Sequence, residues 1–281
     1  MRVISRKMTD RLMKYLSLLV TVAAITPLVW IIASIISNGA SVLSWEFLTS
    51  LPKPFGESGG GIGNAILGTF IINALASVWS IPMGVAIGIY LSEYDRGSKL
   101  GAVVRTAIES LSGVPSIIFG VFAFTLIVLT VRHYTALAAA LALGLMMIPL
   151  VAKATEESMK VVSEDVREAA IALGIPKWAR TVKIVLSLAR GGVLSGALLA
   201  FARISGETAP LLFTALFSFF WPIGLDQPMA TLQVMIYNYA LSGFSDWVSK
   251  AWGASLILML IVLTINVAVR GVTRQKYAEG T

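Results

Sequence analysis

The 281-residue sequence contains no cysteine and only one histidine, His133. The absence of cysteine excludes disulfides, thiol chemistry and a cysteine-ligated metal site. The pattern Gly-x-x-x-x-Gly-Lys-Ser/Thr is also absent, so the chain has no P-loop for ATP. His133 falls in a short segment between apolar runs, where a solvated turn residue is expected rather than a ligand. The sequence therefore predicts no catalytic residue, no metal site and no cofactor in this chain.

Charged residues are scarce as well. They make up 13% of the chain, against about 25% in typical soluble domains, whereas 57% of the residues are hydrophobic. The apolar residues come in long runs, each able to cross a hydrocarbon core of about 30 Å as a helix. We therefore expect an all-α polytopic membrane protein. Positively charged cytoplasmic loops account for the net charge of +7, which needs no nucleic acid to explain it.

The apolar runs predict six transmembrane helices in one transmembrane domain that covers residues 1–281. The first run is longer than the apolar part of a signal peptide, and no convincing cleavage site of small residues follows it. We therefore expect it to be a retained helix. The expected spans are residues 12–36, 63–91, 114–131, 135–151, 191–209 and 252–269.

The distribution of Lys and Arg gives the orientation of these spans. Eighteen of these residues lie in the N-terminal segment, in residues 93–112 and 152–190, and in the C-terminal tail. The alternate segments contain only Lys53, Arg132 and Lys250. We therefore expect both termini and the long loop 152–190 to lie on the cytoplasmic side of the membrane.

The loop 152–190 contains a helix-forming segment that ends at a glycine. Ser163 is a suitable N-cap, and the acidic Glu164 complements the dipole of the first turn. Strong helix formers follow up to Gly174, where a glycine stop is expected, and Pro176 then suits the start of a second short helix. An amphipathic connector on the membrane surface would share these properties, so the local pattern leaves both interpretations open.

The spacing within this loop resembles a known family. Glu-Ala-Ala, three residues, Gly, nine residues, Ile-x-Leu is the pattern of the cytoplasmic coupling loop of ABC importer permeases. The resemblance implies a MetI-like permease fold, in which the first helix of the loop docks on an ATP-binding subunit and transmits its closure to the membrane helices. The proline that usually follows the leucine is Ser187 here, which leaves the docking half intact. The matching residues are Glu168, Ala169, Ala170, Gly174, Ile184 and Leu186.

The fifth expected span contains two charges. Arg203 and Glu207 are four residues apart, so on a continuous helix they share a face with Gly192 and Gly196. A charge at this depth costs about 3 kcal/mol or more unless it is paired or hydrated. Two compatible interpretations stay open: a structural ion pair, or a gate at which Arg203 meets an anion. Asn73 of the second span is expected to line the same path, although hydrogen bonding to another helix explains it equally well.

Three further segments resemble one branch of the ABC importer permeases, the PstA-type permease subunits of phosphate importers. They are residues 59–69 (GGGIGNAILGT), 111–120 (LSGVPSIIFG) and 203–215 (RISGETAPLLFTA). The resemblance implies a multi-pass protein of the cell membrane that forms the phosphate path with a PstC-type permease. It also implies two ATP-binding subunits, which hold ATP and Mg, and an extracytoplasmic phosphate-binding protein.

Two alternatives differ from this hypothesis in substrate or in class. A permease for another oxyanion, such as sulfate, molybdate or phosphonate, would share the coupling loop. A stand-alone secondary transporter would instead show an inverted repeat with broken helices at matching positions, and the sequence has no such symmetry. The favoured hypothesis is a phosphate permease subunit without an ATP-binding site of its own.

Overall fold

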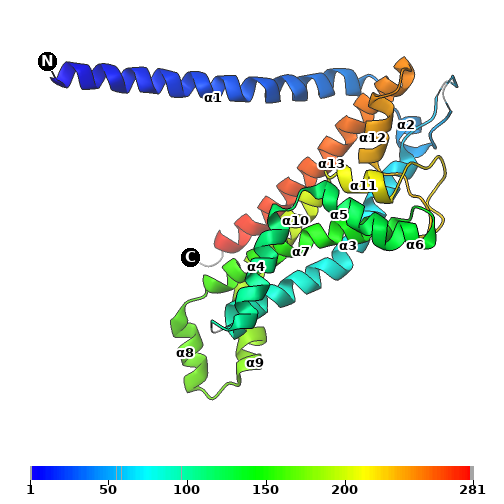
Figure 1. The fold of residues 1–281 in the computed structure, drawn as a ribbon. Helices are drawn as coiled ribbons and strands as arrows, with labels where there is room; N and C mark the ends of the chain where they lie inside the picture. The colour runs from blue at the N-terminus through cyan, green and yellow to red at the C-terminus, as the bar shows by residue number, and fades with distance from the viewer. Residues whose placement is uncertain (1, 55, 58, 96, 279–281) are drawn as a thin grey trace.

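The computed structural model describes the backbone of residues 2–54, 56, 57, 59–95 and 97–278 (Figure 1). The side chains of residues 2–7, 269, 270 and 272–278 lie outside this description. Seven of the positive charges that were counted for the orientation are therefore not described: Arg2, Arg6, Lys7, Arg96, Arg270, Arg274 and Lys276.

All regular structure in the described residues is helical. The long helices are α1 (Arg2–Ala40), α3 (Gly63–Ile89), α7 (Ala136–Lys160), α10 (Leu186–Ile204) and α13 (Ser245–Ala278). The shorter helices are α2 (Trp45–Thr49), α4 (Lys99–Gly113), α5 (Ser116–Ala123), α6 (Leu129–Val131), α8 (Glu164–Ala172), α9 (Lys177–Ala179), α11 (Ala209–Thr214) and α12 (Leu232–Ala240). Three π-helical turns continue neighbouring helices: η1 (Tyr90–Tyr94), η2 (Phe124–Val128) and η3 (Arg180–Val185).

The number of membrane spans agrees with the sequence prediction. Five helices within the described residues are long and apolar enough to cross a membrane. Helix α4 and the helix Ser116–Val131 count as a sixth span when they are taken together, with a bend of 103° between them. The all-α polytopic fold is therefore confirmed, and the third expected span is the second half of a broken helix. The five straight stretches that are long and apolar enough to cross a membrane are Met8–Ala40, Gly63–Tyr94, Ala136–Lys160, Lys177–Ile204 and Ser245–Ala268.

The boundaries predicted for the fifth span are wrong. The fifth span runs over Lys177–Ile204 instead of 191–209, because the helix ends at Ile204 and the chain turns at Ser205 and Gly206. The separate short helix expected after Pro176 is wrong as well, because α9 is not separate. It continues without a break through η3 into α10.

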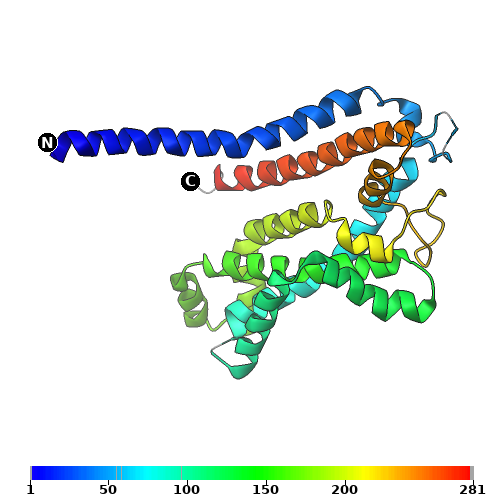
Figure 2. The same cartoon turned by 45° about the horizontal axis from the view of Figure 1, so that its top comes forward.

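Helix α7 lies at the centre of the bundle and contacts α3, α4, α5, α10 and α11 (Figures 1 and 2). Its most extensive contact is with α3. Gly84 and Gly88 of α3 face Val151 and Thr155 of α7, and a Cβ on Gly88 would lie 2.5 Å from the Thr155 Cβ. Small residues allow helix backbones to approach this closely inside a membrane. α7 continues past its predicted end at residue 151 to Lys160.

Two large apolar clusters hold the bundle together. The first cluster lies among α3, α5, α7, α10 and α11 and includes the buried Ile72, Leu143 and Met147. The second lies where α2, α12 and the start of α13 meet and includes Leu232 and Tyr239. It closes the end of the bundle opposite α8, which projects from the other end (Figure 1).

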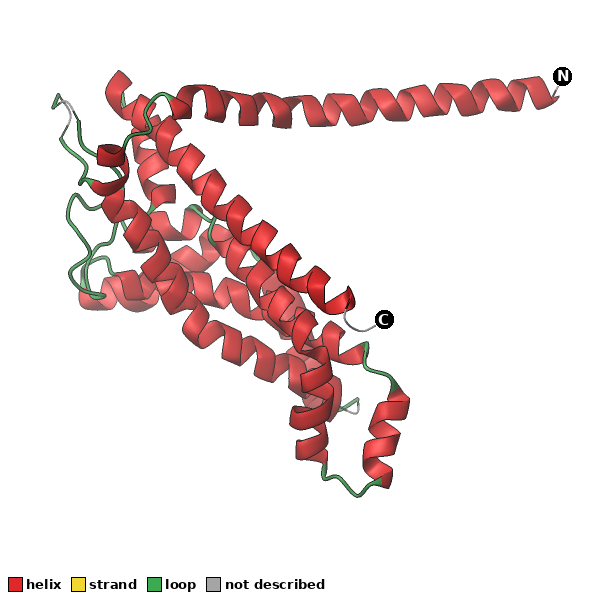
Figure 3. Cartoon of the chain, turned by 180° about the vertical axis from the view of Figure 1, so that it is seen from behind, coloured by secondary structure: helices red, strands yellow, loops and turns green. Residues whose placement is uncertain are grey.

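Helix α1 contacts the remaining helices only near its C-terminal end. There Gly39 lies against the backbone of Trp252 in α13. The rest of α1 stands away from the other helices (Figures 1 and 3). Its apolar side chains, such as Leu16 and Trp30, are exposed. A helix that is apolar all round requires hydrocarbon or another protein as its surroundings.

We expect Gly88→Ala to destabilise the protein. The added Cβ would lie 2.6 Å from the Ala152 carbonyl oxygen and would force α3 and α7 apart. Such overpacking costs about 1–3 kcal/mol, more than the helix gains, about 0.5–1 kcal/mol, when glycine is replaced by alanine. The matched control is Gly113→Ala, since no described atom lies within 4 Å of that Cβ position. Thermal unfolding in detergent measures both variants, and equal melting temperatures would contradict the expectation.

Candidate functional site

Helix α8 and the turn that follows it form the projecting end of the molecule (Figures 1 and 3). α8 begins after Ser163, with Glu164 and Asp165 in its first turn, although the Ser163 side chain makes no capping hydrogen bond. Gly174 adopts a left-handed φ of +71°, and its N–H donates to the Ile171 carbonyl. Glycine adopts this conformation without a steric penalty. The predicted stop at Gly174 is therefore confirmed.

The two faces of α8 differ in exposure. Ala170 is buried, at 3% exposed, whereas Glu168 and Ala169 are exposed. Ile171 and Leu173 beside them are 57% and 78% exposed. Apolar residues gathered on a projecting surface indicate a contact with another protein. Of the predicted coupling residues on this helix, two lie on the open face and one on the packed face.

The other two predicted coupling residues lie on the chain that leaves the loop. Ile184 is in η3 and Leu186 is the first residue of α10, and both are half-buried. Leu186 packs against an apolar cluster that contains Met159 and Val185. Leu186 therefore attaches the fifth span to the bundle, and neither residue belongs to α8 or its open face.

An ion pair that the sequence did not predict joins α8 to the bundle. Arg167 donates from Nε and Nη2 to Glu93 Oε1, at 3.2 and 2.8 Å. It also donates to the carbonyls of Met159, at 2.9 Å, and of Val162. The Arg167 and Glu93 side chains are only 12% and 4% exposed. The sequence signal was an arginine directly before Glu168, but neither hydropathy nor spacing could name its partner.

A second group of charges lies nearby at the same end of α7. Glu156 Oε1 accepts hydrogen bonds from Arg105 Nη1 and Lys160 Nζ, each at 2.6 Å. Asp95 Oδ1 accepts from the Ser98 N–H at 3.0 Å, and this hydrogen bond holds the pKa of Asp95 below its usual value. Both groups of charges contribute to the lining of a polar pocket of about 340 Å³. Basic side chains of this region therefore join structural elements to one another.

The predicted pair of Arg203 and Glu207 is not formed in the described part of the chain. Helix α10 ends at Ile204, and the N–H groups of Gly206 and Glu207 donate to the carbonyls of Arg203 and Ile204 in turns. The four-residue spacing places two side chains on one face only while the helix continues. The prediction that Arg203 and Glu207 lie on one helical face is therefore wrong. Arg203 is exposed and Glu207 is half-buried.

Arg203 nevertheless lies well inside the span. Gly192 and Gly196 pack against α7, where a Cβ on Gly196 would meet the Cβ of Ala154, as expected for a face of small residues. The antiparallel register of this contact places Arg203 level with Met147, near the middle of α7. An unpaired charge at this level costs about 3 kcal/mol or more in hydrocarbon. This face of the chain therefore requires water or another polar surface.

The short helices that follow two helix breaks pack against each other. The break at residues 205–208 leads into α11, and the bend at Val114 and Pro115 leads into α5. α5 and α11 pack closely, since a Cβ on Gly120 would lie 2.6 Å from the Pro210 Cα. Broken helices occur at membrane depth where the backbone is buried in protein or lines a polar cavity. Two of the sequence segments singled out above, 111–120 and 203–215, make this contact.

Asn73 lies in the core, at 3% exposed, and does not line a path beside Arg203. Its Nδ2 donates to Ser205 Oγ at 3.0 Å, and Gln233 of α12 donates to the Ser205 carbonyl. The structure therefore shows hydrogen bonding between helices, the other explanation for this residue. Asn73 and Gln233 together hold the chain at the point where α10 ends.

Comparison with known proteins gives the family. Residues 84–275 match the model of the binding-protein-dependent transport system inner membrane component. The chain belongs to this family of permeases. The permease is 39% identical to the phosphate transport system permease protein PstA of Yersinia pestis over 271 residues, which are 96% of this chain and 92% of the relative. As an inner membrane component of a binding-protein-dependent system, it acts in a complex with other components.

Solved structures share the fold of the permease. A chain of a bacterial ABC transporter that imports alginate matches with a TM-score of 0.69 at 13% identity, over 98% of this chain and 99% of that one. A chain of the MetNI methionine ABC transporter in an inward-facing conformation matches with a TM-score of 0.64 at 18% identity, over 76% and 95%. The MetI-like fold expected from the sequence is therefore confirmed.

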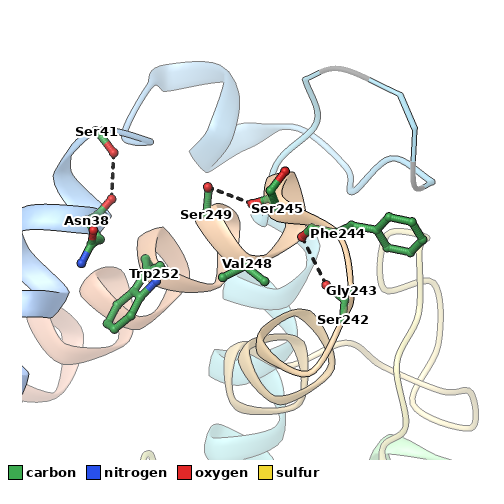
Figure 4. Close-up of a pocket in the computed structure, with 9 residues that line it drawn as sticks. All are labelled: Asn38, Ser41, Ser242, Gly243, Phe244, Ser245, Val248, Ser249 and Trp252. Atoms are coloured by element: carbon green, nitrogen blue, oxygen red, sulfur yellow. Dashed lines mark hydrogen bonds between the residues drawn. The ribbon is translucent and has the colours of Figure 1, made fainter.

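A pocket of about 450 Å³ lies at the opposite end of the permease, between the end of α1 and the start of α13 (Figure 4). It contains none of the predicted site residues. Three of its four serine hydroxyls donate to nearby carbonyls: Ser41 to Asn38 at 2.8 Å, Ser242 to Tyr239 at 2.8 Å and Ser249 to Ser245 at 2.9 Å. The pocket therefore follows from the divergence of α1 from α13 and offers few free donors to a ligand.

We expect Asn73→Leu to lower the stability of the permease by about 1 kcal/mol, the usual net contribution of a hydrogen bond. The change removes the contact between α3 and Ser205 at the end of α10. Ser77→Ala is the matched control on the same helix, because the Ser77 hydroxyl donates to the Asn73 carbonyl within α3 and to Met147 Sδ of α7, and not to α10. Melting temperatures in detergent compare the two. A larger loss for Ser77→Ala than for Asn73→Leu would count against the role assigned to Asn73.

Proposed function

We propose that this permease is one of two transmembrane subunits of an ATP-driven importer and forms a path for inorganic phosphate with a second, PstC-type permease. The observation that carries the proposal is the position of Arg203. Its side chain is exposed, and the register of α10 against α7 puts it level with the middle of the membrane helices. Lipid does not suit such a charge. A path between two permeases supplies both water and a polar surface.

The chemistry of this face suits phosphate. Arginine offers a planar fork of donors with a permanent charge, which matches the oxygens of a tetrahedral anion. Glu207 follows Arg203 in the same break, so a change in the turn 205–208 would move its carboxylate towards or away from Arg203. Glu207 would then gate the anion. The name of the Yersinia pestis relative, a phosphate transport system permease, supports phosphate as the substrate.

Helix α8 is proposed to dock on a cytoplasmic ATP-binding subunit. Its open face offers Glu168 and Ala169 together with the apolar Ile171 and Leu173. The distribution of Lys and Arg, eighteen against three, supports the cytoplasm as the location of this end and of both termini. Two such subunits, holding ATP and Mg, would drive transport, since this chain contains no P-loop.

The opposite end of the permease is proposed to receive an extracytoplasmic phosphate-binding protein. This end is formed by α2, α12 and the segments that connect them to the spans (Figure 1). Trp45 of α2 is highly exposed there, and Trp221 is also exposed. Exposed aromatic residues are enriched where proteins bind one another. The family description, a component of a binding-protein-dependent system, supports this partner.

A permease for sulfate, molybdate or phosphonate is the second candidate, because Arg203 suits any tetrahedral oxyanion. A stand-alone secondary transporter accounts less well for this chain, because it gives no reason for a projecting α8 with an exposed apolar surface. The substrate is therefore the point that an experiment must decide.

We expect Arg203→Ala to reduce phosphate uptake by about tenfold to a hundredfold without reducing the amount of assembled complex. A hydrogen bond to a charged group contributes about 1.5–3 kcal/mol, which corresponds to this range. Uptake into vesicles that contain the full complex measures the effect. Arg190→Ala, which removes an exposed cation from the same helix, is the matched control, and Arg203→Lys should retain part of the uptake.

Competing anions in the same assay identify the substrate. Arsenate should reduce phosphate uptake, since it has the same shape and charge, and sulfate should not. Inhibition by sulfate would favour the second candidate. Unchanged uptake by the Arg203→Ala complex, or loss of that variant from the membrane, would restrict Arg203 to a structural role.

We expect Gly174→Val to uncouple ATP hydrolysis from transport. The left-handed conformation of Gly174 costs a branched residue about 1–2 kcal/mol or more, so the turn that orients α8 would change. No described atom lies within 4 Å of the Cβ position, so a steric clash does not contribute. Asn tolerates this conformation, and Gly174→Asn is therefore the matched control. ATPase stimulation by loaded binding protein measures coupling, and equal stimulation in both variants would refute this role.

A further inference from the structure

Helix α8 is attached to the bundle at few points. Apart from its two chain connections, Ala170 is the only residue of α8 that is buried. The polar attachment is made by Arg167, whose guanidinium reaches Glu93 in η1. The same guanidinium reaches the carbonyls of Met159 and Val162 at the end of α7. One side chain of α8 therefore contacts both of the helices that form the centre of the bundle.

The burial of this ion pair requires an explanation other than stability. Moving two charges out of water is costly, and apolar residues of similar volume often hold two elements together at least as well. The geometry, however, is specific to arginine. Its planar fork bonds one carboxylate and two carbonyls at the same time, which the single ammonium of lysine cannot reproduce. Arg167 therefore fixes the direction of α8 as well as its position.

The second span continues from this ion pair to the break beside Arg203. Glu93 and Asn73 lie on the continuous helix formed by α3 and η1, about 30 Å apart at 1.5 Å per residue. Asn73 donates to Ser205 at the end of α10. The close packing of Gly84 and Gly88 against α7 keeps α3 from moving independently of α7. Arg167 and Ser205 are thus connected through one continuous helix, in which Pro82 lies between Asn73 and Glu93.

We propose that the Arg167–Glu93 ion pair is the positioning contact that transmits the movement of α8 to α3 and, through Asn73 and Ser205, to the helix break beside Arg203. The proposal rests on the proposed function, because an ATP-binding subunit must move α8. Arg167 acts through Glu93 and touches neither nucleotide nor the transported anion. Its removal therefore affects coupling and leaves docking intact.

The test uses the assembled complex with Glu93→Gln, Arg167→Met and the double variant. The matched control is Lys160→Met, because Lys160 lines the same pocket and its ion pair is with Glu156 of α7, not with α8. Co-purification of the ATP-binding subunits measures docking. Basal ATPase activity shows whether those subunits still hydrolyse ATP. The decisive readout is the ratio of ATPase activity with loaded binding protein to basal activity.

We expect each single variant to keep docking and basal activity. The ratio of stimulated to basal ATPase activity should fall by about tenfold, a size typical of residues that couple distant sites. The double variant should lose no more than either single variant, because each change removes the same ion pair. Arg167→Lys should restore only part of the stimulation. Lys160→Met should resemble the unaltered complex.

The outcomes separate the two proposals. An unaltered complex without phosphate uptake or stimulation would reject the proposed function. A coupled unaltered complex with fully coupled single variants would reject only the role of the ion pair. A single variant that leaves one buried charge unpaired can fail to assemble, and the double variant then decides. A double-variant complex that assembles and is uncoupled supports the proposal. A double-variant complex that is fully coupled, or that does not assemble, overturns it.

Discussion

The close contact between α3 and α7 is the constraint on which the rest of the permease depends. In a membrane, lipid is as apolar as the side chains, so helices associate through fitted packing of small residues and through polar contacts. Gly84 and Gly88 provide this packing against α7. The functional elements are attached to this pair of helices, α8 through Glu93 and the end of α7, and the break in α10 through Asn73 of α3.

The helix break at residues 205–208 is possible because the freed polar groups find partners inside the bundle. Gln233 donates to the Ser205 carbonyl, and the Thr135 N–H donates to the Thr214 carbonyl at the end of α11. Unsatisfied backbone groups at membrane depth would each cost several kcal/mol. With its inner side held in this way, the break leaves Arg203 on the outer side of the chain, where a polar path or a second subunit meets it.

The sequence predicted the features that depend on composition and local conformation. Hydropathy predicted the number of spans, and Gly174 predicted where α8 ends. Both features follow from the properties of a single segment. The end of α10 was misplaced, because the expected span continued to the residue before Pro210. The helix ends at Ile204, and Ser205 then accepts hydrogen bonds from Asn73 and Gln233. The ion pair of Arg167 was missed for a related reason, since its partner, Glu93, lies 74 residues away.

A short helix that projects from a membrane protein is a poor transmitter of movement unless its orientation is fixed. α8 has nine residues, too few to be stable alone, and its connections at either end are turns that can rotate. Packing of Ala170 restrains its position but not its direction, because one small side chain defines a pivot. The fork of Arg167 adds bonds to two further elements and removes that freedom. Coupling in this permease therefore depends on a buried polar contact as much as on the exposed face that meets the partner.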